Sequence, residues 1–207
     1  MKKLYLILAI LMLMFTSLKA QDTKSILIFG DSITAGLGVE PQQAFPALIQ
    51  SKIDSLGLNY NVINGGLSGE TSAGGLRRID WVLQREVDIM ILELGGNDGL
   101  RGIELSSTKE NLQEIINKSK SKYPEIEILI AGMQVPPKLG TEYTKEFVEI
   151  YPSLAKENSL PLIPMILDKV GGNSDLMQSD QIHPNVEGHR VVAEEIWGYL
   201  QPLLQKN

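Results

Sequence analysis

Cysteine is absent from the 207 residues of this chain, and histidine occurs only twice. The lack of cysteine excludes disulfide bonds, thiolate metal sites, a cysteine nucleophile and a lipid-modified N-terminal cysteine. Because only His183 and His189 are present, any chemistry that needs an imidazole must use one of these two residues.

Basic residues are also in deficit, with 19 Lys and Arg against 25 Asp and Glu. The formal net charge of −6 repels phosphate backbones, so we expect no nucleic acid partner. A content of 43% hydrophobic and 21% charged residues is ordinary for a globular protein. The length suits one domain with a full-sized core.

Long hydrophobic runs are missing except at the start of the chain. Lys2 and Lys3 precede an uninterrupted apolar run over residues 4–15, a pattern typical of a signal peptide. Twelve apolar residues are too few for a transmembrane helix, which needs about 17 to 20. We therefore expect residues 1–20 to be a signal peptide and 21–207 the mature domain. The protein would be periplasmic or secreted, with no stable membrane anchor after cleavage, and an uncleaved anchor is the alternative.

Short apolar runs alternate with longer helical patterns through the rest of the chain. Residues 26–29 are continuously apolar and end at Gly30, as expected of a central strand that is covered on both faces. Four further segments composed mainly of apolar residues predict strands, at residues 61–63, 87–94, 126–131 and 162–166. Five strands alternating with five helices predict a three-layer α/β domain with a parallel sheet.

Local signals add detail to this pattern. Ser107 with Glu110 predicts a capping box at the start of the third long helix. Pro164 suits an edge strand because proline cannot donate a ladder hydrogen bond. Residues 64–75 are rich in glycine and serine, which predicts a loop after the second strand.

Three polar, glycine-rich segments follow the first three predicted strands. Because ligands bind outside the carboxyl ends of the strands in an open parallel sheet, we expect the segments to share one site. A serine there can expose its hydroxyl, while a glycine N–H and an asparagine amide can donate to an anion. The structural alternatives are a helix N-cap for the first segment and ordinary turns for the other two. The segments are Gly30-Asp31-Ser32-Ile33, Ser68-Gly69-Glu70-Thr71 and Gly95-Gly96-Asn97-Asp98.

A serine hydroxyl becomes an effective nucleophile when a base accepts its proton. His183 lies just before the last predicted helix, and Asp180 is three residues upstream. Asp180 can reach the imidazole Nδ1 and hold the tautomer that leaves Nε2 facing a serine. His189 instead shares the apolar stripe of the last helix and is predicted to be packed and buried. These patterns favour Ser32 as nucleophile, His183 as general base and Asp180 as the group that orients the histidine.

In order and spacing, these four segments resemble the sequence blocks of the SGNH (GDSL-type) serine hydrolases over nearly the whole mature chain. Residues 68–72 and 93–102 are similar to the branch of periplasmic acyl-thioesterases, lysophospholipases and arylesterases. The resemblance implies a flavodoxin-like sheet, no metal or cofactor, and hydrolysis of acyl esters through an acyl-enzyme on Ser32. It also implies an oxyanion hole formed by the backbone N–H groups of Ser32 and Gly69 and the side-chain amide of Asn97.

Two features bear on the substrate and on the surroundings of the site. Glu70 stands where this branch commonly has aspartate, so we expect it at most behind the site. Residues 133–140 are expected to form a wall of the acyl groove.

We expect a small-molecule or lipid acyl ester as substrate and a monomeric protein. A carbohydrate O-acetyl esterase with the same catalytic residues is one alternative. The other is a non-catalytic flavodoxin-like binding module, which would not explain the spacing of Asp180 and His183.

Overall fold

The structure, a computed structural model, describes residues 23–136 and 140–204, so the expected signal peptide lies outside the described residues. Five parallel strands form one sheet in the order β2-β1-β3-β4-β5. This confirms the predicted five-stranded parallel sheet. Its strands are β1 (Lys24–Gly30), β2 (Tyr60–Gly66), β3 (Ile89–Glu93), β4 (Glu127–Ala131) and β5 (Leu162–Ile163).

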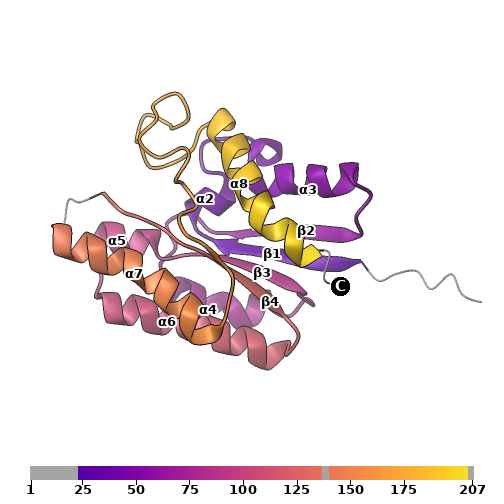
Figure 1. Cartoon of the computed structure of the whole chain (residues 1–207), viewed down its shortest axis with the longest axis horizontal. Coiled ribbons are helices and arrows are strands. Elements are labelled where there is room, and N and C mark those ends of the chain that lie inside the picture. Colours follow the sequence, from indigo (N-terminus) through magenta and orange to yellow (C-terminus); the bar gives the residue numbers. More distant parts are fainter. Residues whose placement is uncertain (1–22, 137–139, 205–207) are drawn as a thin grey trace, which may run out of the picture.

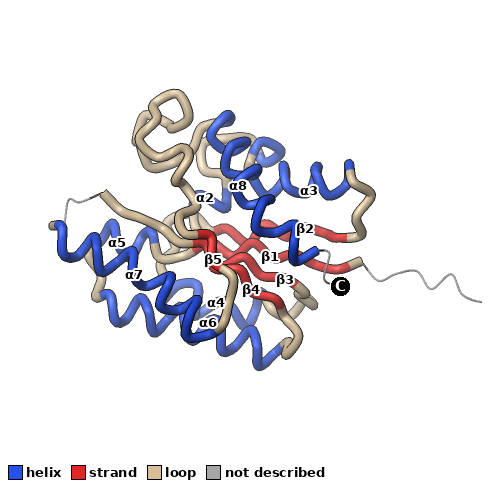
Figure 2. The backbone as a smooth tube through the Cα atoms, viewed as in Figure 1, coloured by secondary structure: helices blue, strands red, loops and turns tan. Residues whose placement is uncertain are grey.

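Helices cover both faces of this sheet (Figure 1). α3 (Phe45–Ser55) and α8 (Val186–Leu204) pack against each other on one face. On the opposite face, α6 (Leu105–Lys122) packs between α4 (Ser72–Val82) and α7 (Thr141–Asn158). Figure 2 shows the strands enclosed between these two helical layers. The three-layer α/β architecture is therefore confirmed.

The two central strands carry the core, because strands covered on both faces bury every side chain. All apolar residues of β1 from Ile26 to Phe29 are fully buried. In the register of the sheet, Gly30 of β1 lies beside Gly66 of β2 and Glu93 of β3. The carboxyl ends of these three strands therefore meet at one edge, which brings the three polar segments of the sequence together.

Three short helices near this edge were not predicted. They are α2 (Ser32–Ala35), the 3-10 helix η1 (Pro41–Gln43) and α5 (Gly96–Arg101). Each has at most six residues, which is too short for an apolar stripe to show in the sequence. α2 and α5 directly follow β1 and β3, so they determine how the polar side chains after these strands point.

Several predicted boundaries were wrong. α4 begins at Ser72, so residues 72–75, which were expected in a loop, are helical. β2 continues through residues 64–66, which were expected in a loop, because they pair with the last three residues of β1. α6 begins at Leu105 with Glu104 as its N-cap and no capping side-chain hydrogen bond. Ser107 and Glu110 therefore lie inside the helix, and the predicted capping box does not form.

The chain between β5 and α8 forms a long loop that lies beside α2 (Figure 1). Asn185 ends this loop, and its Oδ1 accepts a hydrogen bond from the backbone N–H of Gly188 at 3.0 Å in the first turn of α8. β5 lies at the edge of the sheet, as predicted, but it ends at Ile163 and not at residue 166, so Pro164 follows the strand and is not part of it. None of the helices within the described ranges is long and apolar enough to cross a membrane.

Candidate active site

Ser32 begins helix α2 at the carboxyl end of β1. Asp31 is the N-cap of this helix, and its Oδ1 accepts a hydrogen bond from the N–H of Ile33 at 3.0 Å. The turn is tight, because a Cβ at Gly30 would lie 2.2 Å from both Glu93 Oε2 and Thr34 Oγ1. A helix N-cap was the structural alternative for this segment. Asp31 has that role, whereas Ser32 lines a cavity.

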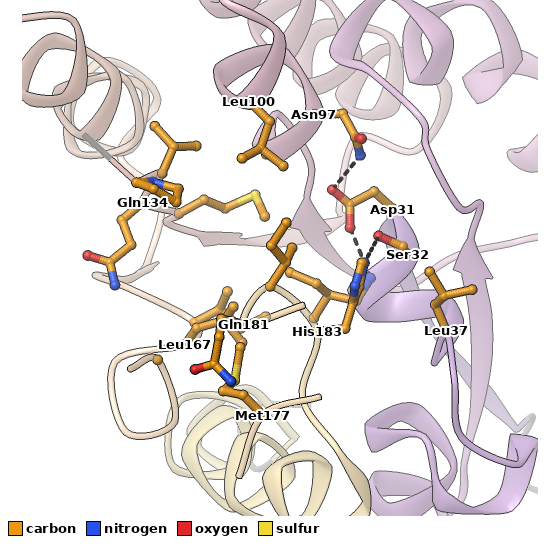
Figure 3. Close-up of a pocket in the computed structure, with 18 of the residues that line it drawn as sticks. Asp31, Ser32, Leu37, Asn97, Leu100, Gln134, Leu167, Met177, Gln181 and His183 are labelled. Carbon is orange, nitrogen blue, oxygen red and sulfur yellow. Dashed lines mark hydrogen bonds between the residues drawn. The ribbon is translucent and has the colours of Figure 1, made fainter. Parts of the chain in front are cut away.

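Ser32, His183 and Asp180 are linked by a chain of hydrogen bonds. Ser32 Oγ lies 2.8 Å from His183 Nε2 (Figure 3), and His183 Nδ1 lies 2.7 Å from Asp180 Oδ2. The other carboxylate oxygen of Asp180 accepts backbone hydrogen bonds from Ile182 and His183. Gln181 adopts a left-handed conformation with φ 58°, within the turn that lets Asp180 reach back to the imidazole. Residues 151 positions apart in the sequence are thus brought together.

The charge of Asp180 suits this arrangement. Burial raises the pKa of the Asp180 carboxyl, but the hydrogen bonds from the His183 side chain and from two backbone N–H groups outweigh burial and lower the pKa to about 2. Asp180 is therefore ionised at neutral pH and stabilises a positively charged imidazole. A neutral His183 can accept the Ser32 proton in this geometry, and the resulting imidazolium is stabilised by Asp180.

Gly69 and Asn97 reach the same cavity from two other loops. Gly69 has φ +78°, a conformation that strongly favours glycine. Asn97 lies in the first turn of α5, and its Nδ2 donates to Asp31 Oδ2 at 3.1 Å. Within the described ranges, the backbone N–H groups of Ser32 and Gly69 donate to no other protein group. Three N–H donors near the serine are therefore available to a ligand.

Asp98 holds the loops after β2 and β3 together. Its buried carboxylate accepts hydrogen bonds from the backbone N–H of Ser72 at 2.8 Å and from the Ser72 hydroxyl at 2.5 Å. Thr71 caps the same helix, α4, by accepting from the N–H of Gly74. Because Ser72 is the first residue of α4, Asp98 joins α5 to the start of that helix.

Glu70 lies behind the site, as expected. It is buried and forms an ion pair with Arg78. The guanidinium of Arg78 also donates to the carbonyl oxygens of Gly65 at 2.7 Å and Gly30 at 3.3 Å. The pair therefore ties the loop that contains Gly69 to the ends of β1 and β2.

Two buried carboxyl groups beneath Ser32 were not predicted. Glu93 is fully buried, and its Oε2 accepts from the Asp31 N–H at 3.2 Å and from the Thr34 hydroxyl at 2.6 Å. Its Oε1 has no partner in the described part of the chain. Burial, together with the charge of Asp31, raises the pKa of Glu93 well above its ordinary value. Burial raises the pKa of Asp31 to about 6. The sequence contained one signal for this group, because Glu93 lies among apolar residues of the predicted strand 87–94. Glutamate is rarely buried, so an acidic residue in a buried strand indicates a special role.

The second histidine is packed and buried, as predicted. His189 is 1% exposed, and its Nδ1 accepts from the backbone N–H of Phe45 at 3.3 Å. The two rings also stack with centroids 6.1 Å apart. Burial, with a smaller contribution from the charge of His183, lowers the pKa of His189 to about 4. His189 is therefore neutral at neutral pH and does not line the cavity.

The cavity beside Ser32 and His183 has a volume of about 550 Å³ (Figure 3), within the range of roughly 300–1,000 Å³ that is usual for small-molecule sites. The expected groove wall is confirmed for residues 133–136, whereas 137–139 lie outside the described residues and Gly140 does not line the cavity. Among residues 23–136 and 140–204, no cluster of acidic and histidine side chains could hold a metal ion. The apolar side chains that line it are Ile33, Leu37, Leu100, Met133, Val135, Pro136, Ile166, Leu167, Met177 and Ile182.

The chain matches the model of the GDSL-like Lipase/Acylhydrolase family over residues 28–191. It is 37% identical to Esterase TesA of Pseudomonas aeruginosa, over 87% of this chain and 90% of that protein. It is 36% identical to Thioesterase 1/protease 1/lysophospholipase L1 of Escherichia coli K12, over 94% and 91%. The crystal structure of the psychrotrophic esterase EstA from Pseudoalteromonas sp., inhibited by monoethylphosphonate, is similar with a TM-score of 0.83 and 32% identity, over 87% of this chain and 98% of that chain. This chain therefore belongs to the GDSL-like lipase/acylhydrolase family and is an ester hydrolase of the SGNH type.

Proposed function

We propose that Ser32 is the nucleophile of this ester hydrolase, His183 its general base and Asp180 the group that orients the histidine. The observation that carries this assignment is the hydrogen-bond chain from Ser32 to Asp180 beside an apolar cavity. A non-catalytic binding module would have no need for an ionised carboxylate that fixes the tautomer of a histidine facing a serine.

The reaction proceeds by two acyl transfers. Ser32 Oγ attacks the ester carbonyl carbon while His183 Nε2 accepts the hydroxyl proton. The tetrahedral intermediate then collapses, the bond to the leaving oxygen or sulfur breaks, and His183 returns the proton to the leaving group. Water attacks the acyl-enzyme in the same way, which releases the carboxylic acid and restores Ser32.

The negative charge of each tetrahedral intermediate needs donors that are already in place. We assign this role to the backbone N–H groups of Ser32 and Gly69 and to the amide of Asn97. These residues come from three different strand ends and line the same cavity. Their orientation is maintained by the contacts of Asp31, Asp98 and Glu70 described above.

For the substrate, we propose acyl chains longer than acetyl. The cavity wall is largely apolar, and each buried methylene group contributes about 0.8 kcal/mol, close to fourfold in kcat/KM until the cavity is filled. The Escherichia coli relative has lysophospholipase and thioesterase in its name, which supports fatty acyl esters or thioesters. A carbohydrate O-acetyl esterase would show the opposite preference.

We also propose that the protein is exported to the periplasm or secreted after loss of residues 1–20. This rests on the two lysines and the short apolar run at residues 4–15, a pattern typical of signal peptides. N-terminal sequencing of the protein recovered from outside the cytoplasm tests it, and a chain that still begins at Met1 would contradict it.

Two measurements test the assignment of site and substrate. Incubation with a p-nitrophenyl phosphonate, followed by peptide mass spectrometry, should find the adduct on the peptide containing Ser32 and none on Ser32→Ala. An adduct on a different serine would contradict the assignment. Initial rates with p-nitrophenyl acetate, butyrate, octanoate and laurate should rise beyond acetate. A maximum at acetate would favour the carbohydrate esterase, and no hydrolysis together with no labelling would favour the binding module.

A further inference from the structure

Arg101 makes a contact between the loops after β2 and β3 that the proposed mechanism does not use. It is the last residue of α5, and its side chain is exposed. One nitrogen of its guanidinium, Nη2, donates to the carbonyl oxygen of Gly69 at 2.9 Å and, more weakly, to Asn97 Oδ1 at 3.4 Å. A single side chain therefore contacts both residues to which the proposed function assigns the oxyanion donors beyond Ser32.

The amide of Asn97 lies between two charged groups. Its Nδ2 donates to the carboxylate of Asp31 at 3.1 Å (Figure 3), and its Oδ1 faces the guanidinium of Arg101. A reversed amide would place Oδ1 against the carboxylate and the NH₂ group against the cation, so the charges favour one orientation. Since the NH₂ group has two hydrogens and Asp31 accepts one, the other remains available to an oxyanion.

Gly69 has no side chain through which its loop could be held. Its φ of +78° lies in a region that glycine adopts readily because it has no Cβ. The direction of its peptide groups therefore depends on the contacts of its backbone. On the C-terminal side, Glu70 is anchored by Arg78. At Gly69 itself, the carbonyl oxygen accepts the hydrogen bond from Arg101. This contact restricts the rotation of the glycine whose N–H is proposed as an oxyanion donor.

We infer that Arg101 is a positioning residue of the oxyanion hole, which holds the Asn97 amide and the Gly69 backbone in the orientation needed by the transition state. The inference rests on the proposed roles of these two residues. Arg101 does not line the cavity, so it acts through its neighbours. Lysine would be a poorer substitute, because its ammonium group ends a flexible chain and can rotate, whereas the two hydrogens of Nη2 lie in the fixed plane of the guanidinium.

The test compares Arg101→Met and Arg101→Lys with Arg77→Met. Arg77 is a matched control, because it is exposed on α4 and its side chain makes no hydrogen bond or ion pair within residues 23–136 and 140–204. With an uncharged p-nitrophenyl ester, kcat of Arg101→Met should fall about tenfold, less than the 100- to 1000-fold that loss of a whole donor costs. KM and the unfolding temperature should change little, Arg101→Lys should be intermediate, and Arg77→Met should match wild type.

A double-mutant cycle shows whether Arg101 acts through the donors. In the Asn97→Ala background, Arg101→Met should reduce kcat by about threefold or less, because one of its two targets is already gone. An equal loss in both backgrounds would overturn the inference, as would a rise in KM with unchanged kcat, which indicates substrate binding. Full activity of Arg101→Met beside an inactive Ser32→Ala would refute this inference and leave the proposed function intact. Full activity of Ser32→Ala would refute the proposed function.

Discussion

Replacement of Asn97 by alanine tests the part of the site that stabilises charge. The tetrahedral intermediate places a negative charge on the former carbonyl oxygen, and Asn97 is the only proposed donor that a side-chain substitution can remove. Loss of one such donor costs on the order of 100- to 1000-fold in kcat, roughly 3 to 4 kcal/mol. The effect should appear in kcat and leave KM nearly unchanged, because the full charge exists only near the transition state.

The same substitution should have a separate and smaller effect on stability. Asn97 Nδ2 donates to Asp31, which is 2% exposed and keeps the hydrogen bond from the Ile33 N–H. Removing one partner from a buried polar group costs about 1–3 kcal/mol. For a domain of this size, each kcal/mol lowers the unfolding temperature by about 2–4 °C. Rates should therefore be measured well below that temperature, with folding followed by circular dichroism.

Asn97→Asp is the companion variant. It preserves the size of the side chain but places a carboxylate beside the carboxylate of Asp31 and opposite the developing oxyanion, so its kcat should be at least as low as that of Asn97→Ala. Steady-state kinetics with p-nitrophenyl butyrate distinguish the two effects. If Asn97→Ala hydrolysed this ester within about threefold of the wild-type rate, Asn97 would be only a turn residue and the oxyanion assignment would be refuted.

Three further predictions concern the residues around Ser32. Ser32→Ala should abolish hydrolysis and keep the wild-type circular dichroism spectrum, and more than a few per cent of activity in a verified pure sample would contradict the nucleophile assignment. His183→Ala should be comparably inactive, whereas His189→Ala should keep its turnover and lose stability in urea unfolding; the opposite pattern would mean that the base was misassigned. Because burial raises the pKa of Glu93, the folded state binds its proton more tightly than the unfolded state. The free energy of unfolding should therefore fall by up to about 1.4 kcal/mol per pH unit as pH rises from the unfolded pKa to the folded pKa. Glu93→Gln should remove this loss, and an identical pH dependence of urea unfolding in both proteins would show that the carboxyl is not the cause.

The sequence alone was sufficient for the sheet and for the residues proposed to act in the reaction. The strands could be predicted because central parallel strands are buried on both faces and therefore appear as continuous apolar runs. The pairing of Asp180 with His183 could be predicted because the two residues are three positions apart in one turn. At this spacing their side chains can meet independently of the rest of the fold. That Ser32, Gly69 and Asn97 share a site followed from their positions after three parallel strands, since such strands end at one edge.

Only the tertiary structure decided the contacts that hold these groups in position. The Glu70–Arg78 pair, the burial of Glu93 beneath Asp31 and the hydrogen bond from Arg101 to Gly69 join different elements of the chain. α6 likewise begins two residues before the predicted capping box, and β2 extends as far as its neighbour β1 allows. Patterns in the sequence report interactions between residues that are close along the chain or that repeat with a regular period. The packing of one loop against another depends on where all the elements lie in space, and no local pattern records it.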